Sequence, residues 1–346
     1  MTSVANPASV APAAPSAPIE RWLARPPYGL KSGLVLLVVL IALGWSAQRV
    51  QIDVMIHQLG EAVGAQLGLA PQSQVGRGIA RVGEAMFPPV ISERTELARI
   101  EDLDRERLPW LARIEREQTR EARLDPRTLQ MEETVSEREV LVEPFGYATR
   151  VAAKMLETLE IAFWATLLAV LLSAPLAYFG AANYAPNRFA YGTARGAVSL
   201  LRAIPELISA LFLVLAFGFG PVAGILALGL HAAGFLGKFY AEDIENADRK
   251  PQEALAALGA SKLKVIWTAV LPQVLPQYVA YTMYVLDRNV RMATVIGIVG
   301  AGGIGQELKG RYDLFNYGHV TTILIAIFLT VFALDQVSAR LRRRLL

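Results

Sequence analysis

Residues Glu253-Ala254-Leu255-Ala256-Ala257-Leu258-Gly259 form a short segment rich in Ala and Leu, and Ala269-Val270-Leu271-Pro272 follows after nine further residues. Local signals on both sides of Gly259 predict two short helices joined by a sharp turn. Pro251 suits the first turn of a helix, where its missing N–H is harmless, and places Glu253 in that turn near the positive helix end. Gly259 permits the turn, and Ser261 suits the N-cap of a second helix that ends before Pro272. The segment is therefore expected to form a rigid knob.

Long apolar runs surround this loop. Of the 346 residues, 53% are hydrophobic and 19% are charged, which is more apolar than a typical soluble domain. Several runs approach the roughly 20 residues that cross a bilayer as a helix; they are 33–47, 158–182, 198–219, 222–239, 274–299 and 320–337. A cleaved signal peptide is the alternative for the first run, but Trp45 fits the small-residue cleavage rule poorly. Because a helix closes its own backbone hydrogen bonds, an all-α integral membrane protein with six helices is predicted.

The charges divide the chain into two parts. Residues 50–153 hold 18 of the 31 acidic and 13 of the 34 basic residues, a net charge of −5, and the remainder carries +8. Positive residues mark the cytoplasmic ends of membrane helices. Four segments outside 50–153 are basic; they contain Arg21, Arg25, Lys31, Arg188, Arg195, Arg249, Lys250, Lys262, Lys264, Arg340 and Arg342–Arg344. With six spans, all four segments fall on one side of the membrane. This arrangement places both termini in the cytoplasm and residues 50–153 outside.

The acidic part is expected to be helical. Residues 94–124 are dense in Glu and Arg, and Glu101/Arg105 and Arg113/Glu117 have the i,i+4 spacing of helical ion pairs. A broken apolar stripe crosses the same stretch, and Pro109 interrupts it. Two helices with a kink or turn between them are predicted. A solvated helical insertion and a docking surface for an external partner are the alternatives for its role.

A glycine-rich stretch follows the fifth apolar run. Gly300, Gly302, Gly303 and Gly305 lie in a pattern that resembles a dinucleotide-binding fingerprint. The acidic residue expected about 20 positions later is missing, and only 41 residues remain after Gly305. The four glycines are instead expected to permit close backbone packing at the outer end of the membrane helices.

The loop quoted first resembles the EAA loop of ABC importer permeases. Glu253, Ala254, Gly259, Leu271 and Pro272 match that pattern at the proper spacing, and two positions differ from it by apolar replacements, Leu255 and Ala269. Further stretches look like the permease of phosphonate-type ABC importers, a family that also includes phosphite and hypophosphite carriers; they are 157–162, 201–207, 271–277, 289–295 and 299–305. This resemblance covers the chain from about residue 157 onward.

The resemblance implies the transmembrane domain of a type I ABC importer. We expect a disordered cytoplasmic N-terminal tail over 1–32, a first membrane helix over 33–49, and an acidic, extracytoplasmic helical insertion over 50–153. The permease core would occupy 154–346, with the coupling loop at 242–272. The family's function is import by alternating access, in the bacterial cytoplasmic membrane.

The resemblance also implies partners. The coupling residues Glu253, Ala254, Gly259, Leu271 and Pro272 would dock on an ATPase subunit. Two ATPases work together in such importers, and one chain offers one loop, so a second permease copy is expected, most simply as a homodimer. An extracytoplasmic binding protein would deliver the substrate. ATP and Mg²⁺ would be bound by the ATPases, and no cofactor by this chain.

Charged side chains within the apolar runs are candidates for the substrate pathway or a gate. Asp287, Arg288, Asn289 and Arg291 lie in the fifth run, where a positive field would attract an oxyanion. Asp287 and Arg291 can also pair at i,i+4, which leaves a purely structural role open. Arg202 and Glu206 could form an internal salt bridge or part of an inner gate, and His231 could serve packing or the pathway.

Other functions are less compatible with the sequence. The absence of Cys excludes disulfides and thiolate metal sites, the three His residues lie far apart, and no metal site, nucleotide-binding loop or catalytic triad is expected. The basic C-terminal run is more typical of a lipid contact than of nucleic-acid binding. The alternatives are a permease for methionine, glycine betaine or sulfonate, and a membrane-anchored sensor, for which the cytoplasmic segments are too short.

Overall fold

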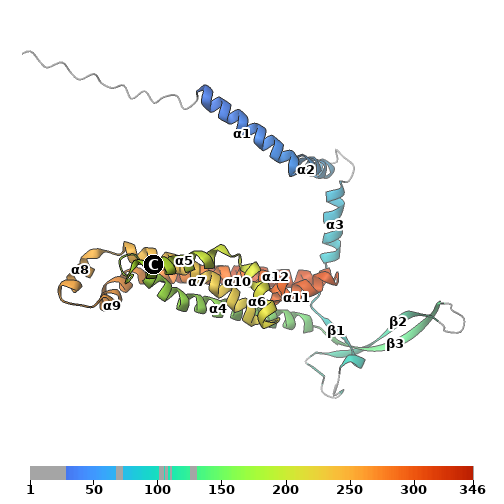
Figure 1. Cartoon of the computed structure of the whole chain (residues 1–346). Coiled ribbons are helices and arrows are strands. Elements are labelled where there is room, and N and C mark those ends of the chain that lie inside the picture. The colour runs from blue at the N-terminus through green and yellow to red at the C-terminus, as the bar shows by residue number, and fades with distance from the viewer. Residues whose placement is uncertain are drawn as a thin grey trace, which may run out of the picture. The chain divides into compact units, whose positions relative to one another are not determined.

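The computed structural model describes residues 29–67, 73–100, 105, 108–109, 111–124 and 131–345, and most of these residues are helical (Figure 1). The chain divides into two compact units, Met1–Arg81 and Val82–Leu346. The tail expected to be disordered lies almost wholly outside the described residues, as does Glu101.

The first unit contains a long apolar helix. α1 (Leu30–Arg49) is followed by α2 (Ile52–Gln66), and the chain turns between them at Gln51, whose φ is +58°. α3 (Gln74–Met86) begins in this unit and ends in the second. Residues 31–49 are long and apolar enough to cross a membrane, which confirms that the first apolar run is a helix. Apolar side chains are exposed all around α1, as expected for a helix surrounded by lipid.

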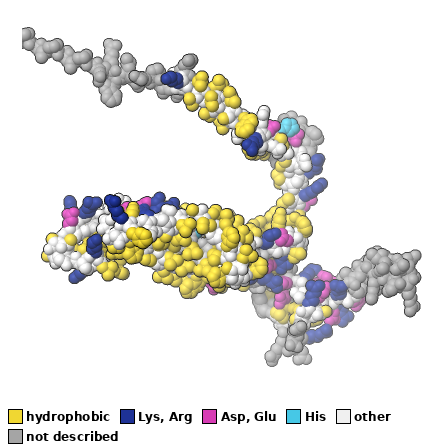
Figure 2. Space-filling view, in the orientation of Figure 1, with side chains coloured by type: hydrophobic (Ala, Val, Ile, Leu, Met, Phe, Trp, Pro, Cys, Tyr) yellow, Lys and Arg dark blue, Asp and Glu magenta, His cyan; other side chains and the backbone are white. Residues whose placement is uncertain are grey.

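The second unit is built on a helical bundle. Its long helices lie alongside one another (Figure 1); they are α4 (Gly146–Gly180), α5 (Arg188–Ala203), α7 (Pro221–Asn246), α10 (Leu271–Ile296) and α12 (Tyr317–Leu345). The shorter α6 (Glu206–Phe217) lies between α5 and α7 in the chain and turns away from α5. α4 and α7 pack closely because small side chains line their contact: a Cβ on Gly229 would lie 3.2 Å from the backbone oxygen of Ala165. Hydrophobic side chains cover the middle of the bundle on the face seen in Figure 2.

The structure bends the third predicted span. α5 and α6 meet at an angle of 90° across Ile204 and Pro205, so 198–219 is not one straight helix. The cause is local, because Pro205 has no N–H and disfavours a helical conformation of the residue before it. α4, α7 and α12 supply three further candidate spans, and α1 a fourth.

α10 is also a continuous helix of 26 residues. It is not among the helices apolar enough to qualify as spans in the described part of the chain, since Asp287, Arg288 and Arg291 lie in its second half. The described helices thus give four candidate spans, or up to five with the bent pair. The count of six stays a prediction.

The prediction of two helices within 94–124 is wrong. This stretch contributes to an antiparallel sheet of β1 (Glu93–Glu96), β2 (Arg113–Leu124) and β3 (Met131–Glu143), with the order β1-β3-β2 and a 3-10 turn, η1 (Leu97–Arg99), after β1. The insertion over 50–153 is therefore helical only in part.

Ion pairs between strands replace those expected along a helix. Arg94 binds Glu117 at 2.7 Å, and Arg138 binds Glu96 at 2.6 Å. The hydrogen bond from Arg138 holds the pKa of the Glu96 carboxyl below its usual value. Arg113, expected to pair with Glu117, instead contacts Glu115 at 2.6 Å.

The base of the sheet is fastened to the bundle. Val140, Leu141 and Val142 of β3 are buried. The segment just before β1 binds the start of α12, since the Val90 N–H donates to the Gly318 carbonyl at 3.1 Å and the Thr322 hydroxyl donates to the Val90 carbonyl at 2.6 Å. The sheet therefore emerges at one end of the bundle (Figure 1).

Candidate functional site

The knob predicted from the sequence is present at the end of the bundle opposite the sheet (Figure 1). α8 (Arg249–Ala257) is capped by Asp248, whose carboxylate accepts the Lys250 N–H at 3.0 Å. α9 (Lys262–Val265) is capped by Ser261, as predicted. Glu253 lies in the second turn of α8 and not in the first, because the helix begins at Arg249, two residues before Pro251.

Gly259 makes the turn between the two helices. Its φ is +79°, in the left-handed region that favours glycine. The Gly259 N–H donates to the Ala256 carbonyl at 2.9 Å, and the Ala260 N–H donates to the Leu255 carbonyl at 3.1 Å, so these two carbonyls near the end of α8 are satisfied. The turn therefore has a fixed direction.

The second helix does not end before Pro272. α9 continues through a π-helical turn at Ile266–Val270 directly into α10. Pro272 has no N–H to donate to the Thr268 carbonyl, and the wide turn accommodates its ring without a break. Leu271 and Pro272 therefore join the knob to a long helix of the bundle, so a displacement of the knob reaches α10 through continuous helix.

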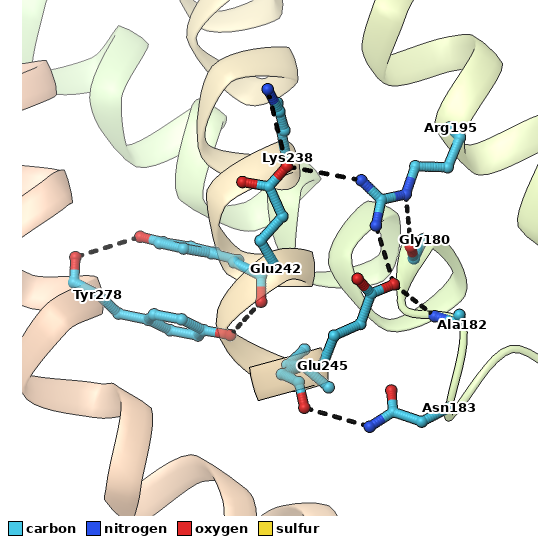
Figure 3. A network of polar contacts seen from close by, with 10 residues as sticks. Gly180, Ala182, Asn183, Arg195, Lys238, Glu242, Glu245 and Tyr278 are labelled. Atoms are coloured by element: carbon cyan, nitrogen blue, oxygen red, sulfur yellow. Dashed lines mark hydrogen bonds and ion pairs between the residues drawn. The ribbon is translucent and has the colours of Figure 1, made fainter. Parts of the chain in front are cut away.

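A polar network fixes the bundle at the base of the knob (Figure 3). One Glu245 carboxylate oxygen accepts the Ala182 N–H at 2.7 Å and the Arg195 guanidinium at 2.9 Å, and Arg195 also donates to the Gly180 carbonyl at 2.8 Å. The Asn183 amide donates to the Ile244 carbonyl at 3.2 Å. These bonds tie α4, α5 and α7 together where the chain leaves the bundle.

The knob itself is bonded to this base. The Tyr184 hydroxyl donates to the Gln252 side chain at 2.7 Å, and the Gln252 amide donates to the Asp248 carbonyl at 2.9 Å. The Asp248 N–H donates to the Gln273 side chain at 3.0 Å. The tip stays free: Glu253 and Ala254 are exposed, and Leu258 is 83% exposed. The knob is therefore held at its base by side-chain hydrogen bonds, and its tip presents Glu253, Ala254 and Leu258 to the surroundings.

A second group of charges lies in the bundle at the break between α5 and α6. Glu206, in the first turn of α6, forms an ion pair with Arg288 of α10. His231 of α7 lies 3.0 Å from the Arg288 guanidinium and 3.2 Å from the Glu206 carboxylate. Its other ring nitrogen is 3.2 Å from the Ile204 carbonyl, which the helix break leaves without a helical partner. We call Glu206, His231 and Arg288 the charge cluster.

The other charged candidates do not join the cluster. Arg291 pairs with Asp287 at 2.6 Å, as the i,i+4 spacing predicts, and its side chain is 49% exposed. Asn289 is buried and donates to the Thr166 hydroxyl at 2.9 Å, so it fastens α10 to α4. Arg202 is exposed. The predicted internal salt bridge between Arg202 and Glu206 is wrong, because Glu206 contacts Arg288 and His231 instead. The inner-gate alternative for these residues stays a prediction.

Sequence reasoning did not anticipate Phe235 at the charge cluster. Its ring centre lies 5.7 Å from the Arg288 guanidinium carbon, within the range of a cation–π contact. His231 and Phe235 have i,i+4 spacing on one helix. This spacing is the signal in the sequence that could have predicted that both side chains contact the same residue, Arg288.

The glycine-rich stretch packs closely, and its backbone binds α4. The Gly303 N–H donates to Glu157 at 2.9 Å, and the Ile304 N–H donates to the Thr158 hydroxyl at 2.8 Å. Both N–H groups lie at the N-terminus of α11 (Ile304–Asp313). Gly300, Gly302 and Gly303 have positive φ, and a Cβ on Gly297 would lie 2.5 Å from the Gly302 carbonyl oxygen. A carboxylate of the chain itself thus occupies the place where a dinucleotide fold would bind phosphate.

Comparisons with known proteins find a matching family and similar transport permeases. Residues 170–346 match the family described as "Binding-protein-dependent transport system inner membrane component". A "Putative phosphite transport system permease protein" of Stutzerimonas stutzeri is 61% identical over 261 residues, which are 75% of this chain and 100% of the relative. A "Phosphite transport system permease protein" of the same organism is 43% identical over 55% of this chain and 69% of its own length.

Among solved structures, a methionine ABC transporter in an inward-facing conformation is 23% identical, with a TM-score of 0.49. It covers 57% of this chain and 96% of the other. The match to the family extends over half of the chain, and the 61% identical relative is matched over its whole length. The chain is thus a multi-pass membrane protein that belongs to the family of binding-protein-dependent transport system inner membrane components.

Proposed function

We propose that the chain is the membrane-spanning permease subunit of an ATP-driven importer for phosphite, phosphonate or a related phosphorus oxyanion. The observation that carries this proposal is the 61% identity to a protein named for phosphite transport, over that relative's full length. A relative named for phosphate import, from Mycolicibacterium smegmatis, is 39% identical over 55% of this chain. The chain would do no covalent chemistry, and its role would be to alternate access to the two sides of the membrane.

The knob of α8 and α9 would couple this movement to ATP. Its free tip and its continuous path into α10 support docking on an ATPase subunit through Glu253, Ala254 and Gly259. ATP and Mg²⁺ would be bound by that partner. This role would place the knob in the cytoplasm, and the basic segments would place both termini there as well. The sheet at the opposite end of the bundle would face the outside, where a binding protein would deliver substrate.

Two ATPases require two knobs, so a second permease is part of the proposal. A homodimer is the simplest arrangement. A second candidate is a pair of different permeases, because Stutzerimonas stutzeri has another relative with the same printed description, 42% identical over 54% of this chain. Co-expression of the chain with two different tags distinguishes the arrangements, since only a homodimer retains both tags in one complex.

The charge cluster would act as a gate in the pathway. Glu206 neutralises Arg288, so Arg288 is not free to bind an anion while the pair is formed. The pair joins α6 to α10 beside the break between α5 and α6, so a rigid-body movement of α6 relative to α10 would separate it. Once the pair is separated, Arg288 would be the cation available to an oxyanion, since Arg291 is itself paired with Asp287 at 2.6 Å.

Uptake by the reconstituted complex tests the substrate class. Proteoliposomes containing the permease, its ATPases and its binding protein should take up phosphite, hypophosphite or a phosphonate, with ATP hydrolysis stimulated by the same anion. A relative named for D-methionine transport is only 27% identical over 52% of this chain. Stimulation by methionine, glycine betaine or a sulfonate, with none by phosphorus oxyanions, would overturn the substrate assignment and leave the permease assignment intact.

Substitution of Gly259 tests the coupling. Gly259→Val should reduce uptake at least about tenfold and weaken association with the ATPase, because a β-branched residue at φ +79° adds strain on the order of 1–3 kcal/mol and displaces the tip. Gly192→Val is the matched control, since Gly192 is exposed in α5 with nothing within 4 Å of an added Cβ. Both properties are measured by uptake and by co-purification with a tagged ATPase. Unchanged association and uptake in Gly259→Val would refute the coupling role.

A further inference from the structure

Two contacts fix the position of the proton on the His231 ring. Its Nδ1 lies 3.2 Å from the Ile204 carbonyl oxygen, which can only accept, so Nδ1 carries a hydrogen. Its Nε2 lies 3.0 Å from the Arg288 guanidinium, which can only donate, so Nε2 accepts through its lone pair. A second proton, on Nε2, would place two cations at that distance. His231 is therefore a neutral imidazole that faces Arg288 as an acceptor.

The same acceptor lies beside the Glu206 carboxylate. Nε2 of His231 is 3.2 Å from Oε1 of Glu206, and this oxygen also forms the ion pair with Arg288. A carboxylate oxygen and an imidazole lone pair are both acceptors, so no hydrogen bond can form between them. An oxygen that carried a hydrogen at the position of Oε1 would donate to Nε2 instead. The cluster thus offers an occupant one donor and one acceptor, and Glu206 uses only the donor.

A donor beside an acceptor matches the monoanion of a phosphorus oxyacid. Hydrogen phosphite and the monoanion of a phosphonate have P–O⁻ oxygens, which accept from a guanidinium, and one P–OH group, which can donate to an imidazole lone pair. A sulfonate has a similar tetrahedral shape and the same charge, but all of its oxygens are acceptors. It would meet His231 with the same mismatch as the Glu206 carboxylate.

The surroundings orient Arg288 and leave it accessible. The ring centre of Phe235 lies 5.7 Å from the guanidinium carbon, so the ring covers one side of the cation. The Arg288 side chain is 25% exposed, against 13% for Glu206 and for His231. Glu206 comes from α6, whereas His231 and Arg288 come from α7 and α10. A movement of α6 away from α10 would therefore withdraw the carboxylate and leave the other two side chains together.

We propose that Arg288 and His231 bind the transported oxyanion within the bundle, and that His231 selects anions with a P–OH group. Glu206 holds the place of that anion in this conformation. The inference rests on the proposed function, because it takes a phosphorus oxyanion as the cargo. An anion without the hydrogen leaves Nε2 facing a second acceptor, and an unmade hydrogen bond of this kind lowers affinity by about 5- to 150-fold.

Nitrogen NMR of the full chain in nanodiscs tests the proposal without a binding protein. The chain has three His residues, so ¹⁵N-labelled histidine gives few signals, and His231→Gln identifies those of His231. The natural protein should show a protonated Nδ1 and an unprotonated Nε2. Methylphosphonate, added as its monoanion, should shift the Nε2 signal. Its dissociation constant should be at least about fivefold lower than that of methanesulfonate, which has the same shape and charge.

Two variants test the roles of Glu206 and His231. Glu206→Gln should bind methylphosphonate at least about fivefold more tightly than the natural protein, because no carboxylate competes for Arg288, and the anion should raise its thermal unfolding midpoint more. His231→Phe should lose the preference for methylphosphonate over methanesulfonate, measured by the shift of the unfolding midpoint with each anion. His57→Phe is the matched control, since His57 is exposed in α2, and it should keep the preference.

Three results in the natural protein would overturn the proposal: a proton on Nε2, equal affinity for the two anions, or no shift at His231 with either anion. The first two results need no variant, so they stand even if Glu206→Gln or His231→Phe does not fold. Uptake of phosphite by the complete transporter, together with any of the three, would reject this site and keep the proposed function. Uptake of no phosphorus oxyanion would reject the function itself.

Discussion

Gly305→Ala should lower the stability of the protein by about 3 kcal/mol or more, or prevent its accumulation in the membrane. The added Cβ would collide with the backbone oxygen of Thr294 and would lie 2.9 Å from the Cα of Gly297. Both are backbone atoms of α10 and the turn that follows it, so no side-chain rotation can relieve the contact. The added Cβ could be accommodated only if α11 moved away from α10. The thermal unfolding midpoint in detergent is the direct measurement.

Gly310→Ala provides the matched control for this change. Gly310 lies in the same helix, five residues further on, and nothing lies within 4 Å of an added Cβ. Because Ala favours a helix by up to about 1 kcal/mol over Gly, this variant should be as stable as the natural protein or slightly more so. Equal stability of the two variants would contradict the close packing at Gly305.

The second large effect is expected at the charge cluster. Arg288→Met should destabilise the protein by about 3–5 kcal/mol, because it leaves the largely buried Glu206 carboxylate without its guanidinium partner. Glu206→Gln should have a similar cost for the opposite reason. The double variant Glu206→Gln/Arg288→Met should recover most of the stability, since no unpaired charge remains. Thermal unfolding of the four proteins forms a double-mutant cycle.

Uptake by the same four proteins separates a structural role from a gating role. All three variants should lose most uptake if separation and re-formation of the pair are part of the transport cycle. Lys309→Met is the control for stability, because both side chains of the Lys309–Asp313 pair are about half-exposed and such pairs are worth less than about 1 kcal/mol. A double variant that is both stable and fully active would refute the gate and leave the ion pair a structural element.

Features that depend on neighbours in the chain were predictable. The turn of the knob follows from Gly259 and Ser261, whose effects act within one helical turn. The predictions tied to the prolines were wrong, since Glu253 lies in the second turn of α8 and the second helix continues past Pro272. The Asp287–Arg291 pair follows from i,i+4 spacing in an uninterrupted helix. The same spacing failed at Arg202 and Glu206, because Pro205 lies between them and breaks the helix. That proline was visible in the sequence and argued against the pair.

The sheet shows where local reasoning is ambiguous. Alternating Glu and Arg in 113–124 supports ion pairs along a helix as well as across strands. The strand pairing was decided by contacts between residues far apart in sequence, such as Arg94 with Glu117 and Arg138 with Glu96, 23 and 42 positions apart. No local pattern contains that information.

The sequence by itself determined where the chain is apolar, where helices can start and stop, and which family's loop it carries, because these properties depend on composition and on residues within a few positions. Only the tertiary structure decided which charges meet. Glu206 and Arg288 are 82 positions apart, and the Glu157 carboxylate that binds the glycine-rich turn is 146 positions from Gly303. Burial makes such partners obligatory, since a charge inside the bundle is costly without a counter-charge, but it is the packing of α4, α6, α7 and α10 that selects each partner.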